Sequence, residues 1–135
     1  MLGRLFRVWL ARAEGAAMPQ AEGITGRLAA NLDDVIVLIR RPAESDGILR
    51  IERSGKIVDR LYGTALAGEP VARLTPSRED AENEASIVFA SGRSLMMEDQ
   101  VQLPGGPARI ARLYLPFADA NGQAAGILVG IAKVT

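Results

Sequence analysis

The last 42 residues of the chain carry three apolar runs that predict three β-strands. The runs cover residues 94–103, 108–117 and 124–134, and each alternates apolar and polar positions over part of its length. A Pro-Gly-Gly-Pro sequence separates the first two runs and Asn-Gly precedes the third, and both sequences favour turns. The pattern predicts an antiparallel three-stranded meander, with the preceding residues covering one face of the sheet.

Two further strands and a short helix are predicted upstream. Residues 35–39 form a continuous aliphatic run, which is typical of a buried strand, and residues 48–52 form a second strand after a polar turn. Ser54 is a candidate N-cap for a helix that continues to Tyr62. Gly63 follows at the position where a left-handed glycine commonly ends a helix.

The longest helix is predicted to begin at Thr75 and Pro76 and to end at Gly92. Threonine caps helices and proline is favoured in their first turn. The acidic run at residues 79–84, which includes Glu84, is expected to be a solvated face near the positive end of the helix dipole rather than a cation site. The predicted buried side consists of Ala81, Ala85, Val88 and Phe89.

Residues 1–17 are predicted to form a separate amphipathic helix ahead of a domain at residues 18–135. Apolar side chains recur at three- and four-residue spacing, with arginines between them. Such a stripe would dock on the domain, pair with its copy in a dimer, or lie on a membrane surface. We favour docking or dimerisation over membrane contact. The candidate interface residues are Leu2, Leu5, Phe6, Trp9 and Leu10.

Composition excludes several classes of protein. The 135 residues suffice for one domain with a core, and 16 basic residues balance 16 acidic ones, so no overall charge favours nucleic acid. The chain has no cysteine and no histidine. Disulfides, thiol nucleophiles, Ser–His triads and zinc–cysteine sites are therefore excluded. We predict a protein that is not an enzyme and has no metal site.

The sequence also bears on location. No apolar run approaches the roughly 18 to 20 residues that a membrane-spanning helix needs. The apolar run that follows Arg7 has only four residues before Arg12, fewer than the about 7 to 15 of a signal peptide. We therefore expect a cytoplasmic protein.

Several segments resemble a PAS domain, and in particular a single-domain PAS family of alphaproteobacteria. The stretch at residues 49–55, followed by Leu-Tyr-Gly and Leu-Ala-Gly, looks like that family's glycine-bounded helix segment. Arg-Leu-Tyr-Leu-Pro-Phe at residues 112–117, followed by Asn-Gly, is similar to its leucine-rich strand, proline and polar turn. Trp9 and Met18-Pro19 fall near the family's tryptophan-containing helix and its proline-led linker.

The resemblance implies an α+β fold with a five-stranded antiparallel sheet in the order 2-1-5-4-3, covered on one face by short helices. It also implies a bacterial regulatory module for signal transduction. Together with the amphipathic helix at residues 1–17, it leads us to expect a homodimer that binds a signalling protein. Flavin-binding PAS domains with a photochemical cysteine adduct and histidine-ligated haem PAS domains have no counterpart here, because both residue types are missing. We therefore expect no such cofactor.

The alternative is a sensor that holds an apolar or weakly polar metabolite between sheet and helices. A packed core without a vacancy is the more common arrangement in a small domain. The two tyrosines would offer hydroxyl groups to such a ligand, or place only their rings in the core. The candidate ligand-binding residues are Ile57, Leu61, Tyr62, Leu113, Tyr114, Leu115 and Phe117.

Overall fold

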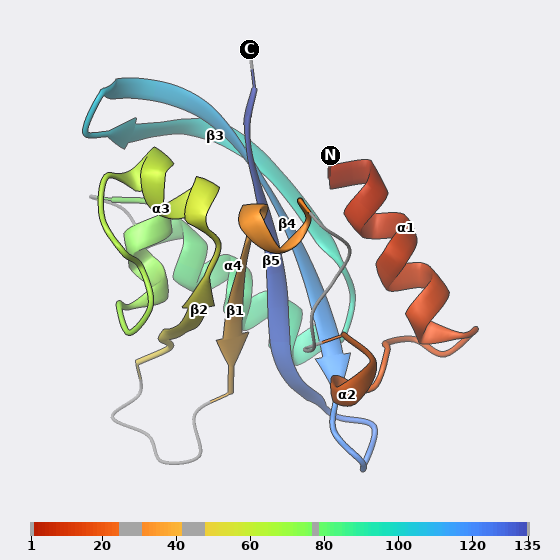
Figure 1. Ribbon diagram of the computed structural model, residues 1–135. Coiled ribbons are helices and arrows are strands. Elements are labelled where there is room, and N and C mark those ends of the chain that lie inside the picture. Colours follow the sequence, from red (N-terminus) through yellow and green to blue (C-terminus); the bar gives the residue numbers. More distant parts are fainter. Residues whose placement is uncertain (1, 25–30, 42–47, 77–78, 135) are drawn as a thin grey trace.

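The computed structural model describes residues 2–24, 31–41, 48–76 and 79–134. Five antiparallel strands form one sheet in the order β2-β1-β5-β4-β3, as predicted. Figure 1 shows this sheet between the N-terminal helix α1 on one side and helices α3 and α4 on the other. The strands are β1 (Ile36–Arg40), β2 (Ile51–Ser54), β3 (Leu95–Leu103), β4 (Gly106–Ala118) and β5 (Ala124–Val134).

The helical elements are short and cover both faces of the sheet. They comprise α1 (Leu2–Ala13), α2 (Ala21–Ile24), the 3₁₀ turn η1 (Asp33–Val35), α3 (Lys56–Tyr62), the 3₁₀ turn η2 (Val71–Leu74) and α4 (Asp80–Ser91). No helix among the described residues is long and apolar enough to cross a membrane.

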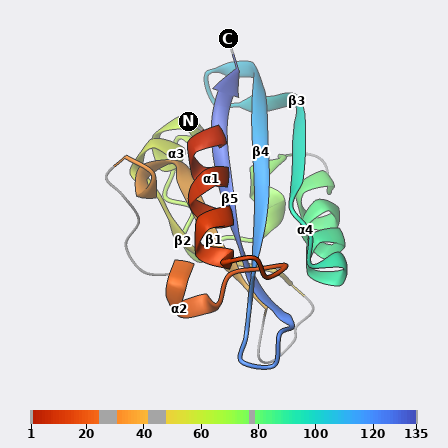
Figure 2. The ribbon, with the colours of Figure 1, turned by 90° about the vertical axis from the view of Figure 1, so that its right-hand side faces the viewer.

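Short helices cover one face of the sheet, as predicted, and the N-terminal helix α1 lies on the other face. Side chains of β1, β4 and β5 alternate between two separate cores, and the central strands are buried on both faces. The inner core lies under α3, η2 and α4, and the outer core lies under α1. Figure 2 shows α1 lying across β5 and β4 on the outer face.

Two element boundaries differ from the predictions for identifiable reasons. β2 begins at Ile51, where its pairing with β1 begins, and the backbone of Leu49 and Ile51 also hydrogen-bonds to residues 68–71. Gly55 is the N-cap of α3 and no side chain caps it, whereas the Ser54 hydroxyl donates to Asp59 at 2.6 Å.

The ends of the helices match the sequence more closely. α4 begins at Asp80 rather than at Thr75, although the Thr75 Oγ1 still accepts a bond from the Ala81 amide at 3.0 Å. Gly63 and Gly92 end α3 and α4 in the left-handed conformation, with φ of 75° and 67°. Glycine tolerates this conformation because it has no Cβ.

Glycines on the outer face of β5 let α1 approach the sheet. A Cβ built on Gly130 would lie 2.6 Å from the Leu5 Cδ2 and 2.7 Å from the Leu2 Cδ2. A Cβ on Gly126 would overlap the ring of Phe117. Any larger residue at these positions would push α1 or Phe117 away from the sheet.

Candidate functional site

The predicted ligand-binding residues do not share one site. The structure places Leu113, Leu115 and Phe117 in the outer core beneath α1, not in the space under α3 and α4. Their placement under those helices was wrong because side chains alternate along a strand, and the even-numbered residues of this part of β4 face inward. Tyr114 therefore faces the inner core.

The other candidates lie on α3 and differ in how deeply they are buried. Tyr62 is buried in the inner core, and its hydroxyl donates to the Leu74 carbonyl at 2.7 Å. Ile57 is 43% exposed, and Leu61 is partly buried. Both of these aliphatic side chains line a groove at the surface.

A buried ion network occupies the inner face where a ligand was considered. The Arg112 side chain is fully buried, and its Nε and Nη2 each donate to a different carboxylate oxygen of Glu84 at 3.0 Å. Its Nη1 and Nη2 donate to the two oxygens of Asp99 at 2.8 and 3.2 Å. The Tyr114 hydroxyl donates to Glu84 Oε1 at 2.5 Å. One guanidinium thus links β4, β3 and α4 through charge-assisted bonds.

The placement of Glu84 and Arg112 corrects the sequence-based interpretation. Glu84 was expected on a solvated face of its helix but is only 6% exposed. Arg112 belongs to an apolar strand, yet it cannot face solvent because both faces of β4 are covered there. Among the described residues, every buried side-chain nitrogen and oxygen has a hydrogen-bond partner. The buried charge of Arg112 is therefore stabilised by its ion pairs with Glu84 and Asp99.

The environment fixes the protonation states of this cluster. Burial raises the pKa of Tyr62 to about 12. Burial and the hydrogen bond to Glu84 raise the pKa of Tyr114 well above its ordinary value. Burial alone would lower the pKa of Arg112, but its bonds to Asp99 and Glu84 outweigh burial and raise it. None of these three groups exchanges a proton near neutral pH, so they do not offer acid–base chemistry there.

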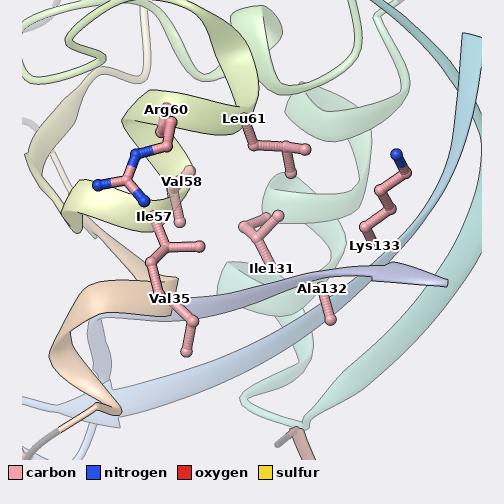
Figure 3. A pocket seen from close by; sticks show the side chains of 8 residues that line it. All are labelled: Val35, Ile57, Val58, Arg60, Leu61, Ile131, Ala132 and Lys133. Carbon is pink, nitrogen blue, oxygen red and sulfur yellow. The ribbon is translucent and has the colours of Figure 1, made fainter.

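A surface groove lies between α3, η1 and the end of β5 (Figure 3). Its volume is about 420 Å³, within the range of small-ligand sites. Val58 and Ile131 form its buried floor, and the cationic groups at its margin are the Arg60 guanidinium and the Lys133 ammonium. The apolar residues that line it are Val35, Ile57, Val58, Leu61, Ile131 and Ala132.

The predicted interface helix is docked on its own domain. Leu2, Leu5 and Trp9 are at most 8% exposed, and the Trp9 indole N–H donates to the Pro116 carbonyl at 2.8 Å. Leu10 remains 49% exposed. The partly buried ring of Phe6 stacks on Trp9, with the ring centroids 5.8 Å apart. Of the predicted interface residues, only Leu10 and part of Phe6 therefore remain for contact with another molecule.

The described residues contain no group of three or more acidic side chains that could hold a metal ion. The chain also lacks histidine and cysteine. The candidate sites are therefore the ion network and the apolar groove.

Comparison with solved structures identifies the fold. A PAS domain from Colwellia psychrerythraea is 19% identical and superposes with a TM-score of 0.57 over 77% of this chain and 91% of that chain. The PAS domain of BvgS from Bordetella pertussis is 15% identical, with a TM-score of 0.51 over 77% and 79% of the two chains. The chain has the PAS fold.

Other similar structures include photoreceptors of the same architecture. The LOV domain of the blue-light photoreceptor aureochrome1 is 14% identical, with a TM-score of 0.60 over 76% of this chain and 83% of that chain. No protein-family model matches the sequence, and no curated protein matches it significantly. The alphaproteobacterial single-domain family therefore stays a prediction.

Proposed function

We propose that this chain is a non-catalytic PAS module of cytoplasmic bacterial signalling, which dimerises and binds a signalling protein. The observation that carries the proposal is the ion network, because Arg112 and its partners fill part of the inner face on which a PAS ligand would rest. Each buried side-chain nitrogen and oxygen among the described residues already has a hydrogen-bond partner, so none is left wholly unpaired to orient a metabolite. The fold then offers its surfaces, rather than its interior, to a partner.

Dimerisation is proposed to use the outward side of α1. Leu10 is exposed, whereas most of the other large apolar residues of α1 are buried against the sheet. The proposed contact is therefore small and centred on Leu10, with the edge of Phe6 beside it. Deleting α1 would be a poor test, because it would uncover Leu113, Leu115 and the rest of the outer core.

A better test is the substitution Leu10→Glu. The mass of the variant protein in solution is then measured by light scattering. The unaltered protein is expected to be a dimer, and the variant a folded monomer with an unchanged far-ultraviolet circular dichroism spectrum. Ile87→Glu is a matched control, because Ile87 is a comparably exposed aliphatic residue on α4. A monomeric unaltered protein, or a dimer that persists in the Leu10 variant, would remove this contact from the proposal.

The second candidate function is a small-molecule sensor, and the groove beside α3 favours it. Its volume of about 420 Å³ and its aliphatic lining suit an apolar metabolite. Ile57 and Leu61 are the two predicted ligand-binding residues that lie there. Native mass spectrometry of protein purified without denaturant separates the two functions. A discrete added mass that is lost on unfolding would favour the sensor, and a ligand-free dimer mass would favour the interaction module.

A further inference from the structure

We propose that the groove beside α3 binds an aliphatic monocarboxylate, with the carboxylate at the Lys133 ammonium and the hydrocarbon chain against the apolar lining. This inference rests on the sensor function, the second candidate given above, and specifies the chemical class of the ligand. Three features support it: the position of the groove, its aliphatic lining, and the sign of the charges at its margin.

The first feature is the position of the groove beside the last residues of β5. β1 pairs with β5 as far as Ile36↔Gly130, whereas β5 continues to Val134. Beyond this pair, η1 and α3 border β5, and the groove of about 420 Å³ lies between these three elements (Figure 3). A volume of this size accommodates a small ligand.

The second feature is the aliphatic lining. Ile57 and Leu61 are one turn apart on α3, so their side chains lie on the same face of the helix. Ile57 is 43% exposed above the buried floor, and a hydrocarbon chain bound there would remove this apolar surface from water. None of the eight lining residues is aromatic, so the groove offers no ring on which a flat aromatic ligand could stack.

The third feature is the sign of the charge. Arg60 and Lys133 are the two residues of the lining whose side chains carry a polar group, and both groups are cationic donors. Neither forms an ion pair within the part of the chain that the structure describes. An anionic head group would complement them, whereas an ammonium group would meet like charge and find no side-chain acceptor in the lining.

The strand register assigns the head group to the Lys133 end of the groove. Side chains alternate along a strand, so Lys133 lies on the same face of β5 as Ile131, which forms part of the floor. Arg60 lies at the opposite side of the apolar lining in Figure 3. A hydrocarbon chain that begins at Lys133 would therefore cross Ile131 toward Ile57. One lysine supplies one positive charge, which a monocarboxylate neutralises.

An NMR titration with octanoate tests the site directly. Octanoate is expected to bind with a dissociation constant on the order of 1 mM, because a small ligand in an open groove gains little free energy per atom. The methyl signals of Ile57, Leu61 and Ile131 should shift together, whereas those of Leu10 and Ile87, which are exposed elsewhere, should not. Shifts confined to residues outside the groove would overturn the proposal.

Related ligands separate the contribution of the hydrocarbon chain from that of the head group. Hexanoate lacks two methylenes and should bind roughly fivefold or more weakly, since each fully buried methylene contributes about fourfold. Octan-1-ol keeps the chain without the charge and should bind roughly two- to fivefold more weakly than octanoate. Octylammonium should bind more weakly still. Equal affinities of octanoate and octylammonium, or of octanoate and hexanoate, would refute the proposal.

Lys133→Gln tests the head group in the protein. The variant loses the charge at that end of the groove, so octanoate should bind roughly two- to fivefold more weakly and octan-1-ol with unchanged affinity. Lys56→Gln is the matched control, because Lys56 is the chain's other lysine and does not line the groove. It should leave both affinities unchanged. A loss of octanoate binding in Arg60→Gln as large as that in Lys133→Gln would overturn the assignment of the head group.

Ile57→Gln tests the aliphatic lining. Glutamine is compatible with a helix, but its amide replaces hydrocarbon in the groove, so octanoate and octan-1-ol should both bind roughly threefold more weakly. Ile87→Gln is the matched control, because Ile87 is a similarly exposed isoleucine on α4 outside the groove. Circular dichroism checks that both variants are folded. An unchanged affinity of Ile57→Gln for octanoate would contradict the proposed position of the chain.

These results are distinguishable from failure of the sensor function. Octanoate binding that depends on Lys133 and Ile57, in a protein that carries no metabolite when purified under native conditions, would keep the site and reject the sensor. A co-purified neutral or cationic metabolite that occupies the groove would keep the sensor and reject the carboxylate ligand.

Discussion

Replacement of Glu84 by glutamine should reveal how strongly the fold depends on the buried ion network. The side chain keeps its shape but loses its charge and one acceptor. Arg112 has no exposure and would then direct one N–H at an amide NH₂ group. The Tyr114 hydroxyl would compete for the remaining amide oxygen.

The expected cost follows from these contacts. Breaking a buried ion pair by removing one partner costs about 3 to 5 kcal/mol. Asp99 remains bonded to Arg112 and is itself partly exposed, so the guanidinium keeps a counter-charge. We therefore expect Glu84→Gln to lower the free energy of unfolding by about 3 kcal/mol, the lower end of this range. This is a large part of the stability of a domain of this size.

Glu98→Gln provides a matched control on the opposite face of the sheet. Glu98 accepts from the Arg109 Nε at 2.6 Å, but both side chains are about half exposed. An exposed pair of this kind contributes at most about 1 kcal/mol. Urea unfolding followed by circular dichroism measures both variants. Equal losses in the two would refute the claim that burial makes the Arg112 network strong.

Three further predictions concern the outer face and the tyrosines. Gly130→Val should displace α1, because its Cβ would meet Leu2 and Leu5, and tryptophan fluorescence should shift to the red; an unshifted spectrum would contradict this. Trp9→Phe should cost about 1 to 2 kcal/mol by leaving the Pro116 carbonyl unpaired, measured by urea unfolding, and a loss below 0.5 kcal/mol would argue against that bond. Absorbance at 295 nm should show no tyrosine ionisation between about pH 10 and 11, because both pKa values are raised. Since the unfolded chain releases these protons first, stability should fall as pH rises above about 10, and a normal native titration would contradict the burial of the hydroxyls.

Sequence patterns predicted most of the elements because these patterns are local. Period-two runs located β3, β4 and β5, and glycines located the ends of α3 and α4. The resemblance to PAS domains supplied the strand order, which no local pattern contains. The start of β2 was predicted three residues too early, at residue 48 instead of Ile51, because an apolar run does not show where pairing with β1 begins.

The candidate site was harder to predict for a physical reason. On a strand that is covered on both faces, apolar residues occur without alternation, so hydrophobicity does not show which face is which. Leu113, Leu115 and Phe117 were therefore assigned to the wrong face. One indication was available, because Arg112 interrupts this apolar run and has the same parity as Tyr114. Its partner Glu84 is 28 residues away and was hidden in an acidic run.

The sequence alone determined the elements, the amphipathic nature of α1 and the absence of thiol and imidazole chemistry, since these depend on residue type and local spacing. The tertiary structure decided where α1 docks, which face of β4 each side chain joins, and which acidic residue is buried. It also decided that β5 extends beyond β1. Those features depend on contacts between residues distant in the chain, where burial gives one arginine its partners and strand register sets which core each side chain of β4 joins.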